Sequence, residues 1–195
     1  MAIDTPATIA VLGAGPIGLE AALYARFLGY DVQLYERGEI AENVTQWGHV
    51  RMFSPFSMNR STLGLAALTA QDPSWRAPGD DQLLTGRELA QRYLIPLSQT
   101  DLLADSIQIQ TSVIRVGRVA ALKADLTGDA SRGECPFVLL LRKADGTEDY
   151  AHADIVIDTS GVYGNHRWMG QGGLPAIGEQ ICESRISYCL PDVLD

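Results

Sequence analysis

Three glycines near the N-terminus have a spacing that suits the binding of a phosphate-bearing ligand. The chain reads Gly13-x-Gly15-x-x-Gly18 between an apolar run and an alanine-rich run. In this arrangement the first glycine permits a tight turn, the second lets backbone approach a diphosphate, and the third lets a helix lie close to a strand. The free N–H groups and the positive dipole end of the helix favour an anion there. The expected contact residues are Gly13, Ala14, Gly15, Pro16, Ile17 and Gly18.

An acid stands at the end of the next apolar run, 18 residues after Gly18. The carboxylate of Glu36 can accept hydrogen bonds from both hydroxyls of a ribose, and it would repel a 2′-phosphate. An exposed acid at a strand end is the alternative interpretation. The guanidinium of Arg37, which follows, either stacks on an adenine or remains in solvent. Together, the glycine motif and the acid predict the ADP half of a dinucleotide as the ligand.

A strand, a turn, a helix and a second strand must hold these residues in place. Residues 7–12 are apolar apart from Thr8, as in a buried parallel strand. A helix is expected over 16–28, because proline suits its first turn and Gly29 its end. A second strand over 31–35 then carries Glu36. A structural turn in an unrelated α/β domain can also contain three spaced glycines, but here all the flanking elements agree with a nucleotide site.

The composition argues against several classes of partner. The 195 residues carry a formal net charge of −9 and no cluster of Lys or Arg, which argues against a nucleic-acid surface. Residues 1–8 lack the basic region of a secretory signal. Glycines, a proline, Glu20 and Arg26 interrupt the apolar stretch 9–28, so no membrane span is expected. We therefore expect a cytoplasmic protein whose partner is a small-molecule nucleotide cofactor.

Cysteine and histidine positions point away from dithiol and metal chemistry. The cysteines form no CxxC pair, which suits a reducing cytosol and removes the dithiol that a disulfide reductase needs. The histidines lie far apart and show no metal-ligand spacing, so no metal site is predicted. These residues are Cys135, Cys182, Cys189, His49, His152 and His166.

An irregular stretch separates the nucleotide motif from the next predicted helix. Residues 38–82 are rich in aromatic and proline residues, which is more typical of a functional insertion than of a plain turn, with a short helix near 63–69. Thr85 and Glu88 match a capping box, so a helix is expected to begin there. Pro96 lies inside the helical pattern and is expected to kink or end the helix.

Mainly β-structure is predicted after residue 105. Apolar runs and alternation indicate strands, Asp145-Gly146 indicates a hairpin turn, and the polar stretch 127–134 indicates a loop. Residues 162–195 are rich in glycine and proline and show weak periodicity. The predicted strands span residues 106–110, 113–122, 137–143, 147–151 and 154–158.

The order of these elements resembles the FAD-binding domain of the flavoproteins that have two dinucleotide domains. That group includes thioredoxin reductase-like and glutathione reductase-like enzymes and the flavin-containing monooxygenases. The resemblance is sharpest at the glycine motif with Glu36 and at the strand 154–158, which leads into Thr159-Ser160-Gly161. The family usually has Ala-Thr-Gly there, beside the flavin, and this chain departs from that pattern but keeps small residues. The resemblance implies an α/β fold: a Rossmann-like FAD-binding domain with a parallel central sheet and a three-stranded antiparallel β meander, in three layers (ββα).

The middle of the chain looks most like the flavin-containing monooxygenases and related N-hydroxylating enzymes. Trp47 stands where those enzymes have a Gly-Gly-x-Trp-like turn, and residues 56–61 resemble their Asn-containing segment beside the flavin. The resemblance implies a catalytic Asn59, which donates a hydrogen bond near the reactive edge of the flavin; a turn or cap role is the alternative. Trp47 would contact the cofactor or belong to the core. Val113 or Val119 would offer backbone contacts to the adenine.

Flavoproteins of this kind normally insert a second domain for NAD(P)H and then return to the FAD domain. Neither follows here, so residues 1–195 are expected to form a single, incomplete FAD-binding domain with the second domain absent. Whether the chain is a fragment, and whether it pairs with another copy or with a missing C-terminal domain, stays open. The sequence thus predicts the FAD-binding part of an NAD(P)H-dependent, monooxygenase-like flavoprotein oxidoreductase. The alternatives are an NAD-dependent dehydrogenase and a non-catalytic truncated nucleotide-binding protein.

Overall fold

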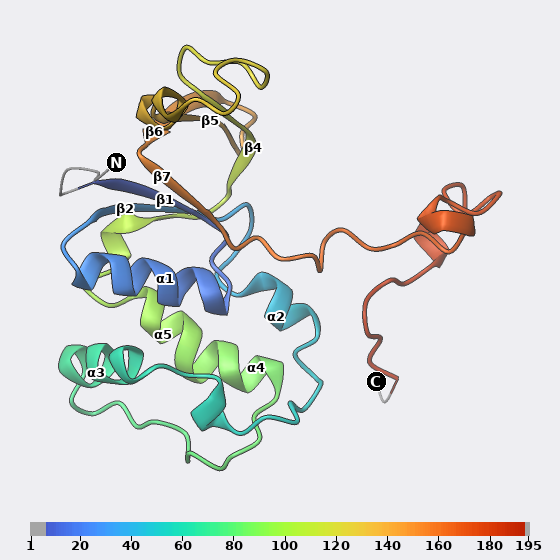
Figure 1. Cartoon of the computed structure of the whole chain (residues 1–195). Helices are drawn as coiled ribbons and strands as arrows, with labels where there is room; N and C mark the ends of the chain where they lie inside the picture. The colour runs from blue at the N-terminus through green and yellow to red at the C-terminus, as the bar shows by residue number, and fades with distance from the viewer. Residues whose placement is uncertain (1–6, 194–195) are drawn as a thin grey trace.

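A four-stranded parallel sheet forms the centre of the protein. The computed structural model describes residues 7–193, and its central strands lie in the order β3-β2-β1-β7 (Figure 1). Every neighbouring pair in this sheet is parallel. The strands are β1 (Thr8–Leu12), β2 (Asp31–Tyr35), β3 (Ile107–Gln108) and β7 (Ile155–Asp158). Residues 106–110, predicted as one strand, contribute only two residues to the sheet, because the chain turns at Gln110, whose φ is 52°.

The other sheet is antiparallel and has the strand order β4-β5-β6. Its strands are β4 (Thr111–Arg118), β5 (Phe137–Lys143) and β6 (Glu148–Ala153). The predicted hairpin at Asp145-Gly146 is present, with Gly146 in the left-handed region at φ 84°. The first strand ends earlier than predicted because Ala120 adopts a left-handed turn at φ 58°. The predicted loop over 127–134 contains a short 3₁₀ turn at its end.

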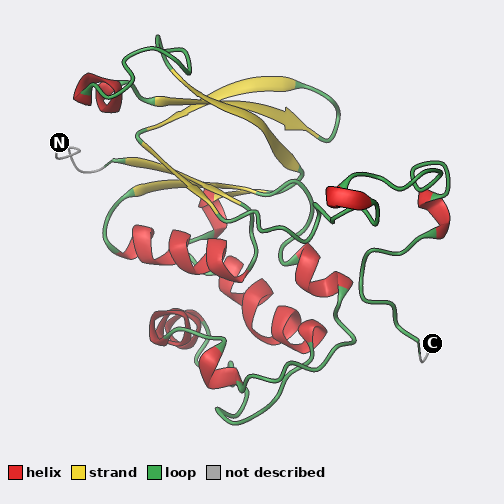
Figure 2. Cartoon of the chain, turned by 45° about the vertical axis from the view of Figure 1, so that its right-hand side comes forward, coloured by secondary structure: helices red, strands yellow, loops and turns green. Residues whose placement is uncertain are grey.

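The parallel sheet is covered on both faces, which explains why the middle of its first strand, β1, is apolar on both sides. Figure 2 shows it between the antiparallel sheet and the helices. Ile9 and Val11 of β1 belong to the core on the helical side, whereas Ala10 packs in a smaller core with Leu139 and Leu141 of β5. The predicted three-layer α/β arrangement is therefore confirmed.

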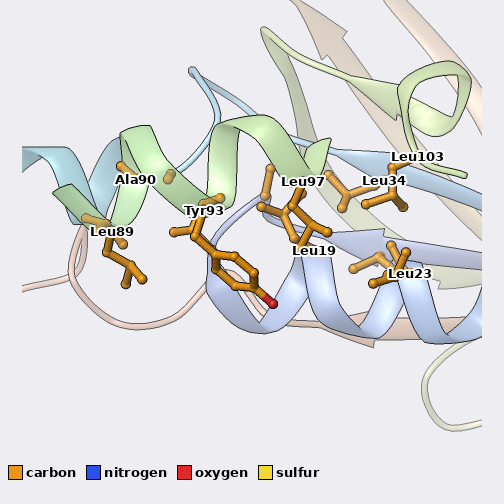
Figure 3. Packing of buried hydrophobic residues seen from close by; sticks show 14 of the residues in the cluster. Leu19, Leu23, Leu34, Leu89, Ala90, Tyr93, Leu97 and Leu103 are labelled. Carbon is orange, nitrogen blue, oxygen red and sulfur yellow. The ribbon is translucent and has the colours of Figure 1, made fainter. Parts of the chain in front are cut away.

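The helical layer is built on α1 (Pro16–Phe27) and on a rod formed by α4, a π-helical turn and α5. Figure 3 shows Leu19 and Leu23 of α1 packed beside Tyr93 and Leu97 of the rod. The Tyr93 hydroxyl donates a hydrogen bond to the Glu20 carboxylate and accepts one from the backbone N–H of Ser61 at 3.1 Å. The elements of the rod span Gly86–Leu89, Ala90–Leu94 and Ile95–Ser98.

The predicted capping box and the predicted disturbance at Pro96 are both present. The Thr85 hydroxyl accepts from the backbone N–H of Glu88, and the Glu88 carboxylate accepts from the backbone N–H of Thr85. Pro96 follows a π-helical turn in which the N–H of Ile95 reaches the carbonyl of Ala90. A proline lacks an N–H and its ring crowds the carbonyl of the preceding turn, so a wider turn lets the helix continue.

Residues 38–82 hold two further helices, α2 (Glu42–Gln46) and α3 (Thr62–Gln71). Trp75 connects this stretch to the rod, because its indole N–H donates a hydrogen bond to the carbonyl of Arg92 at 3.2 Å. Within residues 7–193, every helix is too short or too polar to span a membrane. The 3₁₀ turns span Phe56–Met58, Ala104–Ser106, Ala130–Glu134, Gln171–Gly173 and Glu183–Arg185.

The chain after Gly161 leaves the layers and runs beside them as an extended arm (Figures 1 and 2). A small cluster orders this arm around the buried Glu179, whose carboxylate accepts hydrogen bonds from the Tyr188 hydroxyl and from the backbone N–H groups of Met169 and Ala176. The ring of His166 stacks on Tyr188 with a centroid distance of 3.6 Å. The arm therefore has local order of its own despite its weak sequence periodicity.

Candidate functional site

Two of the three motif glycines are required by the protein's own packing. Gly13 has φ 99°, and a Cβ there would lie 3.1 Å from the Cα of Ser160. A Cβ on Gly18 would lie only 1.8 Å from the carbonyl oxygen of Gly13. The first glycine therefore permits the turn after β1, and the third lets α1 lie against that turn, as the motif predicts.

Gly15 is different, because nothing in the protein occupies the space its side chain would fill. No heavy atom lies within 4 Å of a Cβ built on Gly15, and its φ of −80° is open to any residue. The residue borders a cavity of about 240 Å³ at the N-terminus of α1. No side chain caps this end of the helix, so its first N–H groups have no side-chain acceptor. These N–H groups and the positive end of the helix dipole lie at the edge of the cavity.

A larger cavity of about 580 Å³ adjoins the first one. The two share five lining residues, so they lie side by side along the turns that follow β1, β2 and β7. This is the edge where the carboxyl ends of parallel strands meet, and where ligands bind in open α/β sheets. The shared lining residues are Gly13, Glu36, Asn43, Ser160 and Gly161.

The carboxylate of Glu36 is fixed at the edge of both cavities by two backbone N–H groups. One oxygen accepts from Ala14 at 2.8 Å and the other from Gly38 at 2.9 Å. Neither of the ion pairs found among residues 7–193 includes Glu36. Because each carboxylate oxygen has more than one lone pair, both retain the capacity to accept a hydroxyl of a ligand.

The turn after β7 is tied to the turn after β1. The Thr159 hydroxyl donates to the carbonyl oxygen of Leu12 at 2.8 Å and lies 3.2 Å from that of Gly13. Asp158 accepts from both the hydroxyl and the backbone N–H of Ser160, and these hydrogen bonds hold the pKa of the Asp158 carboxyl below its ordinary value. The threonine hydroxyl thus helps to hold two distant segments of the site in register.

Most of the residues predicted for the site come together in the structure. The predicted residues that line each cavity come from segments up to about 150 residues apart in the chain. The backbone N–H of Ala14 donates a hydrogen bond to Glu36, and Gly18 lies against the turn at Gly13. The larger cavity is lined by Gly13, Glu36, Arg37, Val113, Ser160 and Gly161, and the smaller one by Gly13, Gly15, Pro16, Ile17, Glu36, Thr159, Ser160 and Gly161.

Asn59, Trp47 and Val119 line neither cavity. The amide nitrogen of Asn59 donates to the hydroxyl of Ser54 at 2.9 Å and to the carbonyl of Pro55 at 2.8 Å, so the side chain caps its own turn. Trp47 packs in the helical core, where a Cβ on Gly86 would lie 2.6 Å from its ring. In this structure both residues have the local roles that were their alternative interpretations.

Several lining residues were missed by the sequence reasoning. Asn43 lies on α2, within the stretch that has no regular sequence pattern, and it borders both cavities. Arg115 lies on β4 in the larger cavity, and Tyr163 follows the Thr-Ser-Gly turn in the smaller one. No motif marks any of the three. Within the described residues, no group of three or more His, Cys, Asp or Glu is placed to hold a metal ion.

No protein-family model and no curated protein matches this sequence. Solved structures do resemble it. Bacillithiol disulfide reductase Bdr (YpdA) from Bacillus cereus is 17% identical with a TM-score of 0.61, over 84% of this chain and 42% of that one. S-allyl-L-cysteine S-oxygenase from Allium sativum is 17% identical with a TM-score of 0.56, over 80% of this chain and 36% of that one. OTEMO in complex with FAD and NADP is 18% identical with a TM-score of 0.54, over 80% and 25%.

This chain therefore spans less than half the length of each of these three proteins. Similarity at this level of identity establishes the fold. It confirms the predicted Rossmann-like architecture with its added antiparallel sheet, which this chain shares with the bacillithiol disulfide reductase and with OTEMO, whose structure is a complex with FAD and NADP.

Proposed function

We propose that the two adjoining cavities bind the ADP half of FAD, and that the chain is the FAD-binding part of a flavoprotein oxidoreductase. In this arrangement the adenosine lies in the larger cavity, with its ribose hydroxyls on Glu36 and its adenine near Val113 and Arg37. The diphosphate passes over the turn at residues 13–15, the glycine corner, and enters the smaller cavity at the N-terminus of α1. The fold shared with OTEMO, whose structure is a complex with FAD and NADP, supports this assignment.

The observation that carries the proposal is the open space at Gly15. The folded chain leaves too little space for a side chain at Gly13 or Gly18, but no contact within the described protein explains a glycine at position 15. A ligand that needs backbone at that point does explain it, and a diphosphate lying on the start of α1 is such a ligand.

Bound FAD would supply redox chemistry, accepting a hydride from NAD(P)H and passing electrons on to an acceptor. The residues described here bind and orient the cofactor, and no acid–base group among them is assigned to the chemistry. A monooxygenase activity, with Asn59 near the flavin, is the more specific form of the proposal. It is supported by the resemblance of the middle segment and by similarity to OTEMO and to a steroid monooxygenase bound to NADP.

The test is a pair of glycine variants. Gly15→Val places a branched side chain beside the smaller cavity, where a Cβ meets no atom within 4 Å, so the protein is expected to fold normally and to lose FAD binding. Gly79→Val is the matched control, because a Cβ there also meets no atom within 4 Å and the residue lines neither cavity. Binding is measured by the visible absorption of retained flavin and by titration calorimetry with FAD and ADP.

The outcomes separate the candidate functions. Undiminished FAD retention in Gly15→Val would contradict the motif assignment. Tight binding of NAD without any flavin retention would favour the dehydrogenase alternative, because both ligands share the ADP half. Weak binding of ADP with no preference for either dinucleotide would favour the non-catalytic alternative.

A further inference from the structure

The geometry points to Asn43 as an additional ligand-binding residue whose side-chain amide donates a hydrogen bond to the diphosphate of the bound nucleotide. This inference rests on the proposed function and makes it more specific. Asn43 belongs to no part of the glycine motif, lying on the short helix α2, seven residues beyond Glu36.

The position of Asn43 is the first argument. It lines both the larger and the smaller cavity, together with Gly13, Glu36, Ser160 and Gly161. A molecule that extends from one cavity into the other must pass this shared wall. In a dinucleotide whose adenosine lies beside Glu36, the group that follows the adenosine is the diphosphate.

The second argument is the hydrogen bonding of the asparagine amides. Among the described residues, no hydrogen bond engages the side chain of Asn43, although an asparagine amide has two donor hydrogens. The amide of Asn59, in contrast, is taken up by Ser54 and Pro55. Asn43 is therefore free to donate to a ligand without giving up an internal contact.

The third argument is charge. No Lys or Arg is found among the described residues that line the smaller cavity, whereas Glu36 and Glu42 both border it. The Glu42 carboxylate accepts from the backbone N–H of Glu39 and lies against Gly38. A diphosphate there depends on neutral donors, which include the N–H groups at the start of α1, the amide of Asn43 and the hydroxyl of Tyr163.

The test substitutes Asn43→Asp, which keeps the shape of the side chain but replaces its donor with a negative charge. The probes are ADP and adenosine, measured by calorimetry on the full chain. We expect the affinity for ADP to fall about tenfold or more, and the affinity for adenosine, which carries no phosphate, to change less than about twofold. Gln46→Glu is the matched control, since it makes the same chemical change on the same helix at an exposed position that lines neither cavity.

Asn43→Ser removes the amide without adding charge. Like Asn43→Asp, it is expected to weaken the binding of ADP more than the binding of adenosine. Equal losses for ADP and adenosine in Asn43→Asp would overturn the inference, as would an unchanged affinity for ADP. Wild-type protein that binds neither probe would overturn the proposed function itself. Far-ultraviolet circular dichroism of each variant separates loss of binding from loss of folding.

Discussion

Glu36 has two structural tasks at the edge of the site. Its oxygens hold the backbone N–H groups of Ala14 and Gly38, and so it fixes the turns after β1 and β2 relative to each other. Glu36 also lines both cavities, where a ribose is expected. An acid here therefore organises the protein before any ligand arrives, which limits the reorganisation that binding requires.

Replacing Glu36 with alanine tests this assignment. Glu36→Ala removes the acceptor for the ribose hydroxyls and leaves the Ala14 N–H without its partner, so the binding free energy of ADP is expected to weaken by roughly 1–3 kcal/mol. The measurement is titration calorimetry against wild type. An unaltered affinity would mean that the ribose lies elsewhere.

At the scale of elements, the rod Gly86–Ser98 shows how local signals and tertiary contacts combine. Its start is specified locally by the Thr85–Glu88 capping box. Its middle widens into a π-helical turn before Pro96, and its buried face, with Tyr93 and Leu97, packs on α1. The rod therefore continues past a proline because its apolar face is held by the rest of the helical layer.

The capping box gives a pH-dependent prediction. The hydrogen bond from the backbone N–H of Thr85 holds the pKa of the Glu88 carboxyl below its ordinary value of 4.5. A lowered folded-state pKa means that this stabilisation is present above 4.5 and is lost as the pH falls through the folded-state value. Wild type should therefore be more stable than Glu88→Gln at neutral pH, and this difference in stability should shrink when the pH is taken well below 4.5.

Urea unfolding of the two proteins at both pH values provides the measurement. The glutamine keeps the shape of the side chain and one acceptor oxygen, so the comparison isolates the charge. The same stability difference at both pH values would count against the carboxylate as the source of the effect.

At the scale of the whole molecule, the site lies where the connections of the parallel sheet reverse direction. β1 has β2 on one side and β7 on the other, and the chain reaches β7 only after building the helical layer and the antiparallel sheet. The turn after β1 lies between the turns after β2 and β7, and both cavities are lined by residues of these turns. The site is therefore complete only when residues about 150 positions apart have come together.

Ligand binding at such a site should stabilise the whole fold. If FAD or ADP binds the folded state alone, a concentration of 100 times its Kd is expected to raise the free energy of unfolding by about 2.7 kcal/mol. Thermal unfolding with increasing ligand measures this, and Gly15→Val should show no shift. A similar upward shift in Gly15→Val would place the binding site away from the glycine corner.

The local part of the fold and site was predictable because its causes are local. Gly13, Gly18 and Glu36 act within one strand–turn–helix–strand unit, and the structure places each as the spacing implies. Asn43 and Arg115 were not predictable, because no pattern in the sequence indicates which face of α2 or β4 meets the cavity. Asn59 and Trp47 were assigned by resemblance alone, and their contact with a flavin stays a prediction.

The amino-acid sequence by itself determined the corner that suits a diphosphate, since backbone conformation and helix polarity depend on near neighbours. The order of its predicted strands and helices, together with the resemblance to the FAD-binding domain of known flavoproteins, indicated the layered α/β class. Only the tertiary structure decided which further side chains share the cavity with that corner. Those contacts depend on how α2, β4 and β7 pack against the central sheet, and the packing is set by the whole core rather than by any one segment.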